Sequence, residues 1–188
     1  MIFGEGQDRI DFEIKITHTC TREETMSEKE ITEALNKIPY GFYVLTSRDG
    51  DDMNVMVLNW FTQVSFEPQH VAIGLQKTSY SYGLLQKNKF FAVNILDKDS
   101  SEVIKQFTKS REKNPDKFKS VNYTEGSATG VPILDEAAAY LECEIIEIVE
   151  TGSGHDVVVA KVVGAGVRKQ GKAEDTLTLL DMSWSYSG

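Results

Sequence analysis

The sequence predicts a mainly β protein, an antiparallel sheet closed into a small barrel with helices at its periphery. Between positions 41 and 167, most apolar residues fall in short runs that alternate with polar residues or are rich in β-formers. Turn signals separate these runs, notably Asp49-Gly50 and the Thr-Gly-Ser-Gly stretch at 151–154. Because the helices are too few to cross over between parallel strands, we expect antiparallel pairing, and barrel closure removes the exposed edges.

The first 26 residues form a leader ahead of the main domain. Within the leader, residues 12–16 alternate apolar and charged side chains, as a short strand does. The main domain, residues 27–188, begins with a helix, because Ser27 and Glu30 have the spacing of a capping box. The apolar face of this helix would carry Ile31, Ala34, Leu35 and Ile38.

The rest of the domain is predicted to be mostly strands. They are expected over residues 41–47, 53–61, 70–75, 90–96, 140–150 and 155–167, with a final strand or tail over 177–184. Short helices are expected around residues 82–86 and after Ser100, which would act as an N-cap. Residues 111–130 are charged and rich in turn formers, so we expect a long excursion with one helical turn near Phe118. A change of phase near Ile145 predicts a β-bulge.

Composition excludes several classes of partner. The chain of 188 residues has 20 basic and 29 acidic residues, a net charge of 20 − 29 = −9. This charge argues against nucleic acid and against an anionic membrane surface, because both require clustered Lys and Arg. The sequence lacks a run of about 20 apolar residues, which a membrane span requires, and its N-terminus lacks the apolar core of a signal peptide. We therefore expect a cytoplasmic protein of one main domain.

The two cysteines indicate neither a metal site nor a disulfide. Cys20 and Cys143 lie far apart in the sequence and in different contexts. Cys143 falls in the apolar phase of a strand, where a buried packing role is expected. The glutamates of that strand, residues 142–150, are expected on a solvated face.

Residues 77–82 carry more polar groups than a connecting loop requires. One lysine and five hydroxyl side chains lie between a strand and a short helix. Together with the free N–H groups of a helix start, they suit a phosphate. The alternative is that Ser79 or Ser81 serves only as a helix N-cap.

Asn59 interrupts an apolar strand between Leu58 and Trp60. Asparagine is depleted in strands, and a buried amide needs hydrogen-bond partners. The partner can be neighbouring backbone, or it can be the edge of a polar heteroaromatic ring against which Trp60 also lies.

In their order and separation, these segments resemble the flavin reductase-like, FMN-binding split-barrel family. That family has a run like Asn-Gly-Met-Thr-Ala-Asn-Ser-Phe, a Val-Ser-x-x-Pro-Pro element, a Ser/Thr-rich phosphate loop and a Phe-x-Val-Asn-x-Leu strand. The matching residues here are Asn54, Met56, Asn59, Phe61, Val64-Ser65-Phe66-Glu67-Pro68, Ser79, Ser81 and residues 91–96. The resemblance covers about residues 28–186.

The resemblance implies an antiparallel Greek-key split β-barrel that forms a homodimer with one FMN near each end of the interface. It places the flavin ring against Met56, Val57, Leu58, Asn59 and Trp60, and the phosphate on Lys77, Ser79 and Ser81. Members of the family reduce flavin with NADH or NADPH, or carry electrons on a fixed FMN. The expected partners are therefore flavin and nicotinamide nucleotides and a possible redox partner protein.

Departures from the family pattern concern the nicotinamide more than the flavin. The family's Gly before Met56 is Val55, its Thr is Val57, and its small Ser after Asn59 is Trp60. Trp60 could stack on the flavin or take the place of the nicotinamide. Two hypotheses follow: an NAD(P)H:flavin oxidoreductase that passes electrons to free flavin, a metal complex or a partner protein, and a non-enzymatic FMN electron carrier resembling flavoredoxin. A flavin-free barrel that binds another ligand is the third.

His155 is the single candidate catalytic side chain. It retains the His of the family's Gly-Asp-His, whereas the neighbouring carboxylate is missing or moved to Asp156. The resemblance implies that His155 orients the nicotinamide or supplies a proton near the flavin. The alternative is a structural or solvent-facing histidine.

Overall fold

The computed structural model describes residues 27–119 and 121–183, and its chain divides into two units, residues 1–35 and 36–188. In the first unit, α1 (Glu28–Leu35) begins as predicted. The Glu30 N–H donates to the Ser27 hydroxyl at 3.2 Å, and the Ser27 N–H donates to the Glu30 carboxylate at 3.0 Å. This reciprocal pair is the capping box that the spacing indicated. The expected strand at residues 12–16 lies outside the described residues.

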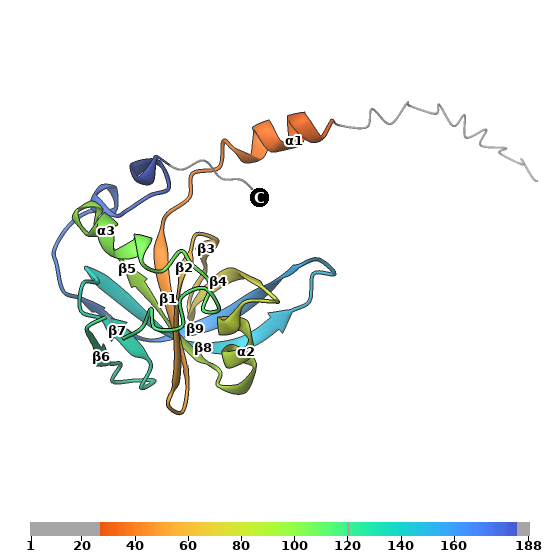
Figure 1. Ribbon diagram of the computed structural model, residues 1–188. Helices are drawn as coiled ribbons and strands as arrows, with labels where there is room; N and C mark the ends of the chain where they lie inside the picture. Colours follow the sequence, from red (N-terminus) through yellow and green to blue (C-terminus); the bar gives the residue numbers. More distant parts are fainter. Residues whose placement is uncertain (1–26, 120, 184–188) are drawn as a thin grey trace, which may run out of the picture. The chain divides into compact units, whose positions relative to one another are not determined.

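The second unit is built on one seven-stranded antiparallel sheet (Figure 1). In chain order its strands are β1 (Tyr43–Asp49), β2 (Asp52–Leu58), β3 (Phe61–Phe66), β4 (Gln69–Gln76), β5 (Phe90–Ile95), β8 (Ala139–Val149) and β9 (His155–Val167). Their order across the sheet is β2-β1-β5-β8-β9-β4-β3, so β5 returns to pair with β1, as in a Greek key. A separate two-stranded sheet, β6 (Tyr123–Glu125) with β7 (Pro132–Leu134), packs against β1 and β5 through β7.

The sheet closes because its two edge strands are neighbours in the sequence. β2 ends at Leu58 and β3 begins at Phe61, yet they stand at opposite ends of the strand order. Only Asn59 and Trp60 join them, so the sheet must curl until its edges meet. The Gly74 N–H donates to the Trp60 carbonyl at 3.0 Å and fixes this junction to β4. The result is the predicted antiparallel barrel, split between β2 and β3.

The barrel interior is filled by apolar side chains from most of its strands. Its buried members include Leu45, Leu58, Ile73, Leu75, Phe91, Val93, Cys143, Val158 and Ala160. Burial raises the pKa of the Cys143 thiol to about 12, so the thiol stays protonated and serves as an apolar filler, as predicted. The interior is therefore a packed core, and any ligand must bind at the outside of the barrel.

One helix adds Tyr82 and Leu85 to the interior cluster, whereas a second helix and the C-terminal segment pack in a separate cluster. The helix α2 (Tyr80–Lys87) packs on β1 and β2, and α3 (Ser101–Lys105) follows the short η1 (Lys98–Ser100). A second apolar cluster contains Phe42, Val44, Val55, Leu96, Ile104, Phe107, Leu134 and Leu177. Among the described residues, the structure contains no helix of the length and hydrophobicity that a membrane crossing requires.

Three expectations about the elements need correction. Residues 53–61 are not one strand, because the chain turns at Asn59 and starts a separate strand, β3. Of the two alternatives for 177–184, a final strand or a tail, the strand is absent from the described part. That part is a tail with isolated β-bridges at Thr176 and Thr178, and the short 3₁₀ turns η2 (Ala173–Asp175) and η3 (Leu180–Met182) flank the buried Leu177. Residues 111–119 form turns but no helix.

The long hairpin of β8 and β9 confirms one expectation and corrects another. The pairing register shifts between Ile145 and Glu147, where the change of phase predicted a bulge. Glu142, however, is buried rather than solvated. Its carboxylate accepts hydrogen bonds from the N–H groups of Ala128 and Thr129 at 3.1 and 2.8 Å, and it thereby holds the turn before β7.

Asn94 is a buried link between three strands, and its replacement should destabilise the domain. Its amide donates to the Val44 carbonyl and the Thr46 hydroxyl, both at 3.1 Å, and accepts from the Leu134 N–H at 2.8 Å. Asn94→Ala leaves that N–H unsatisfied, which costs about 1–3 kcal/mol by itself. Urea denaturation should show this loss, whereas Asn122→Ala, at an exposed position, should stay within about 0.5 kcal/mol of the wild type. Equal stability of the two variants would contradict the assignment.

Candidate functional site

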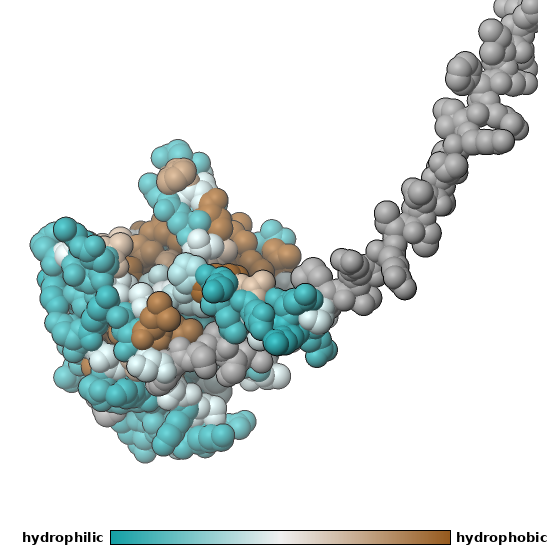
Figure 2. All heavy atoms as spheres, turned by 90° about the horizontal axis from the view of Figure 1, so that it is seen from above, coloured by the Kyte–Doolittle hydropathy of each residue, from teal (hydrophilic) through white to brown (hydrophobic). Residues whose placement is uncertain are grey.

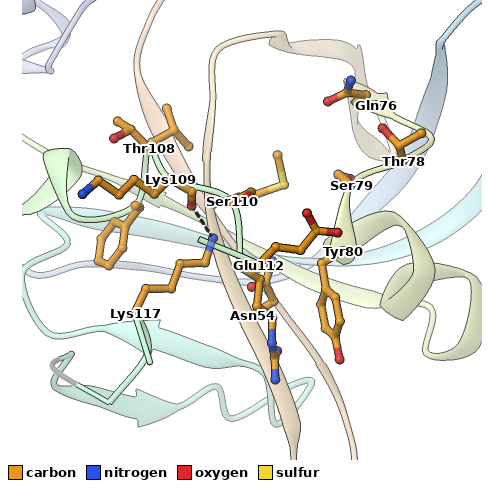
Figure 3. A pocket seen from close by; sticks show the side chains of 14 residues that line it. Asn54, Gln76, Thr78, Ser79, Tyr80, Thr108, Lys109, Ser110, Glu112 and Lys117 are labelled. Carbon is orange, nitrogen blue, oxygen red and sulfur yellow. Dashed lines mark hydrogen bonds between the residues drawn. The ribbon is translucent and has the colours of Figure 1, made fainter. Parts of the chain in front are cut away.

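The larger of two adjoining clefts lies on the outside of the barrel and has a volume of about 520 Å³ (Figure 3). Its walls come from β2, from the connection between β4 and α2, and from residues 107–117. The lining residues are Asn54, Met56, Val57, Gln76, Thr78, Ser79, Tyr80, Phe107, Thr108, Lys109, Ser110, Arg111, Glu112 and Lys117. Hydroxyl, amide and cationic groups from three segments, together with the carboxylate of Glu112, therefore converge on one space.

Ser79 and Ser81, both predicted to contact phosphate, lie in different surroundings. Ser79 is the N-cap of α2 and accepts from the Tyr82 N–H at 3.2 Å, while it also lines the cleft. Ser81 is fully buried, and its hydroxyl is in contact with Ser47 at 3.2 Å and with the Asn54 amide at 2.9 Å. The side chain of Ser79 can reach a ligand in the cleft, whereas the side chain of Ser81 fastens α2 to the barrel.

Lys77 also differs from its expected surroundings. Its ammonium group lies 3.1 Å from a carboxylate oxygen of Asp156, whose side chain is 1% exposed. The Asp156 carboxylate also accepts from the Tyr82 hydroxyl at 2.6 Å and from the Thr151 N–H at 3.2 Å. The Tyr82 hydrogen bond and then Lys77 hold the pKa of Asp156 below its usual value. Lys77 is therefore committed to an internal ion pair.

The cations of the larger cleft come from the excursion after α3, which sequence reasoning missed. Lys117 is buried, and its ammonium group donates to the Lys109 carbonyl at 3.2 Å (Figure 3). Burial, and next the charge of Arg111, lower the pKa of Lys117. The missed signal was a cluster of basic residues in an acidic chain: Lys105, Lys109, Arg111, Lys113, Lys117 and Lys119.

Arg111 fixes this excursion against the barrel. Its guanidinium group lies 3.0 Å from the Asp52 carboxylate and donates to the Met53 carbonyl at 2.6 Å. The same group lies 4.1 Å from the centre of the Tyr80 ring, in a cation–π contact. The excursion, β2 and the start of α2 are thereby held around one cleft.

The smaller cleft, about 130 Å³, is lined by the predicted ring-binding residues. These are Met56, Val57, Leu58, Asn59 and Trp60, and the catalytic candidate His155 lies with them. Gly74, Leu75 and Gln76, which were not predicted, complete the lining. The rings of Trp60 and His155 have centroids 4.8 Å apart and are tilted by 60°. Met56, Val57 and Gln76 line both clefts, so the two spaces adjoin. The structure thus brings together all predicted site residues except Lys77 and Ser81.

The fold and the two clefts place the protein among the antiparallel split barrels. Comparison with known proteins then identifies its family within that class. Residues 35–187 match the family described as Flavin reductase like domain. Because the match covers most of the sequence, the chain belongs to this family, which confirms the resemblance.

Individual relatives agree with the family. Diflavin flavoprotein A 1 of Synechocystis sp. is 31% identical over 143 residues, which are 76% of this chain but 25% of that protein. The NADPH-flavin oxidoreductase of Streptomyces viridifaciens is 27% identical over 72% of this chain and 70% of that protein. The structure of an NADH:FAD oxidoreductase from Streptomyces globisporus has a TM-score of 0.67 and 25% identity, and covers 82% of this chain and 85% of its own. The chain thus spans about a quarter of the diflavin relative.

The absence of a side chain at Gly74 leaves room for the Trp60 indole in the smaller cleft, and a substitution at Gly74 should therefore displace the indole. A Cβ atom at position 74 would lie 2.7 Å from Cε3 of Trp60, so Gly74→Ala must displace the indole and disturb its contact with His155. In a Trp184→Phe background, we expect Gly74→Ala to shift the emission maximum and weaken the near-ultraviolet circular dichroism of Trp60. Gly83→Ala is the matched control, because a Cβ atom there meets no atom within 4 Å. Unchanged spectra in Gly74→Ala would contradict this packing.

Proposed function

We propose that this protein is an NAD(P)H-dependent flavin oxidoreductase that holds FMN across the two adjoining clefts. A single observation carries the proposal: a cationic, hydroxyl-lined cleft meets an aromatic-lined cleft at Met56, Val57 and Gln76. The first cleft has the donors that a phosphate requires, and the second has the flat apolar surfaces that suit a heteroaromatic ring. The residues present therefore fit a flavin nucleotide.

The phosphate end of the flavin would be held by Ser79, the N–H groups at the start of α2, and Lys117 of the excursion. Ser79 and Lys117 line the same cleft, and Arg111 lies at its wall. The N-terminus of a helix favours an anion because its N–H groups point outward. In this arrangement Lys117 takes the role expected of Lys77, and Ser81 acts indirectly through α2.

The ring end would rest on residues 56–60, with His155 opposite Trp60. Bound flavin supplies the hydride acceptor, and hydride transfer from NADH or NADPH requires the protein mainly to position the two cofactors and to exclude water. Val57, Leu58 and the indole of Trp60 form the apolar wall that does so. His155 would orient the nicotinamide or supply a proton near the flavin. Electrons then leave to free flavin, a metal complex or a partner protein.

The relatives support both the reaction and its cofactors. Two are oxidoreductases whose names specify NADPH with flavin and NADH with FAD, and the second has been seen with NAD and FAD fragments. The diflavin relatives carry additional protein beyond the part matched here, which supports a redox partner for this chain. The family relationship leaves the choice between FMN and FAD to experiment. A cytoplasmic location, where reduced nicotinamide is available, is part of the proposal.

One observation favours the second candidate, an FMN electron carrier resembling flavoredoxin. Trp60 and His155 lie in ring contact within the smaller cleft, where a nicotinamide would need space. Electrons can pass where a nicotinamide cannot fit. The two candidates differ in one respect that can be measured, namely reduction of the bound flavin by NADH or NADPH alone.

Anaerobic absorption spectra of the purified protein test the proposal directly. We expect a flavin spectrum that bleaches within seconds on addition of NADH or NADPH. A spectrum that persists until a chemical reductant is added would favour the carrier, and no flavin spectrum after incubation with FMN would contradict both.

Lys117→Met tests the phosphate end separately. Loss of one charge-assisted hydrogen bond should weaken FMN binding about tenfold or more, as measured by quenching of flavin fluorescence. Lys119→Met is the matched control, because that exposed side chain pairs with Asp116. Equal affinity of the two variants would contradict the role given to Lys117.

We also propose that the protein forms a homodimer through the β3 side of the barrel. An apolar cleft of about 550 Å³ lies there, lined by Phe61, Gln63, Gln69, His70, Val71, Leu141, Val162, Gly164 and Ala165. On β3 itself, Phe66 is 85% exposed and Val64 is 52% exposed. Figure 2 shows brown apolar atoms interrupting the teal hydrophilic surface of the face in view. Apolar surface of this kind is typical of an interface.

Light scattering coupled to size exclusion should therefore give twice the 21.1 kDa mass of one chain. Phe66→Lys should shift the equilibrium toward the monomer, because a charge replaces an apolar contact. Leu180→Lys, at a residue that is 81% exposed on the C-terminal segment, is the control that should leave the mass unchanged. A wild-type protein that elutes as a monomer at all concentrations would contradict the dimer.

A further inference from the structure

Asp156 is a buried carboxylate that contacts segments forming the proposed site, but it does not line either cleft itself. It lies on β9 next to His155, and its side chain is 1% exposed. One oxygen accepts from the Tyr82 hydroxyl at 2.6 Å. The other accepts from the Thr151 N–H at 3.2 Å and lies 3.1 Å from the Lys77 ammonium group. Three separate segments, α2, the β4–α2 connection and the β8–β9 turn, thus meet at one carboxylate.

Each of these segments also contributes to the proposed flavin site. The connection after β4 carries Lys77 and continues directly into Thr78 and Ser79, which line the larger cleft. The β8–β9 turn delivers His155 to the smaller cleft. A backbone hydrogen bond also joins the β4–α2 connection to the β8–β9 turn, because the Lys77 N–H donates to the Gly154 carbonyl at 3.0 Å. Asp156 therefore spans the two ends of the site.

The turn around His155 depends on the same contacts. Thr151, whose N–H binds Asp156, also donates its hydroxyl to the His155 carbonyl, and Ser153 donates to that carbonyl at 3.0 Å. On the other side, Tyr82 ties Asp156 to the first turn of α2, whose N-cap is Ser79. A shift of the carboxylate would be transmitted to His155 in one direction and to Ser79 in the other.

A buried carboxylate with these partners has a defined position. An ionised group out of water must be neutralised and hydrogen-bonded, and Lys77, Tyr82 and Thr151 do both. If Asp156 loses its charge, the ammonium group of Lys77 no longer has its counter-ion and can turn toward other acceptors. The ion pair therefore fixes the direction of the Lys77 side chain, because it holds the ammonium group against Asp156.

We propose that Asp156 is a positioning residue that sets the placement of the phosphate-binding connection relative to His155, and that it acts through Lys77 and Tyr82. The inference rests on the proposed function, because it assigns Ser79 and His155 to the two ends of one bound flavin. In this role Asp156 does not contact the cofactor itself.

The test uses the full chain loaded with FMN. Flavin affinity and the rate of anaerobic bleaching by NAD(P)H are measured for Asp156→Asn, Lys77→Met, Tyr82→Phe and the double variant Lys77→Met with Asp156→Asn. Asp156→Asn keeps the shape of the side chain and should weaken FMN binding, or slow bleaching, by about tenfold. Because both residues act through one ion pair, the double variant should be no worse than the more affected single variant. Asp99→Asn, which breaks an exposed pair with Lys169, is the matched control.

A role in folding stability alone predicts different results. It would lower the melting temperature while leaving affinity and bleaching rate at wild-type values in the folded protein at low temperature, and this outcome overturns the inference. Fully additive effects of Lys77→Met and Asp156→Asn overturn it as well. If Asp156→Asn fails to fold, Tyr82→Phe and Lys77→Met must still show the loss. A wild-type chain that binds no FMN contradicts the proposed function itself, whereas an active wild type with unaffected variants contradicts only the positioning role.

Discussion

The two-residue junction between β2 and β3 is the constraint on which the rest of the structure depends. Asn59 and Trp60 connect strands that stand at opposite edges of the sheet, so the sheet can form only as a barrel. The same junction supplies a wall of the smaller cleft, and the adjoining end of β2 supplies Met56 and Val57 to both clefts. The residues that close the barrel are therefore also residues that line the proposed ligand site.

Much of this arrangement could be predicted from the sequence, because local patterns determine it. The alternation of apolar residues gave most of the strands, and the change of phase near Ile145 gave the bulge. Asn59 is unusual within a predicted strand, and the structure gives the reason: Asn59 begins the junction between β2 and β3 and does not continue the strand. The polarity of Thr62, Gln63 and Ser65 obscures β3 in the sequence, because an edge strand of this kind is mostly exposed and has no buried face.

The rest of the site depends on contacts between residues far apart in the sequence, which a local pattern cannot indicate. Lys77 stands in a segment suited to phosphate, yet Asp156, 79 positions later, takes its charge. Lys117 stands in a charged segment that is predicted to be a long excursion, yet the fold buries this residue at the larger cleft. A sequence shows which charged residues a segment contains. Which groups pair with each of them depends on the tertiary structure.

This competition has a consequence for how members of a family can differ. Hydride transfer through a flavin requires positioning more than acid–base groups, so few side chains are needed for the chemistry itself. The residues that form the walls of the clefts can then vary, provided that buried polar contacts keep these walls in place. In this chain such contacts are made by Ser81, which binds the cleft residue Asn54, and by Asp156, which binds Tyr82 and Lys77. The chemistry of the site is thus determined at its surface, and its geometry is determined one layer deeper, by polar groups that the barrel has removed from water.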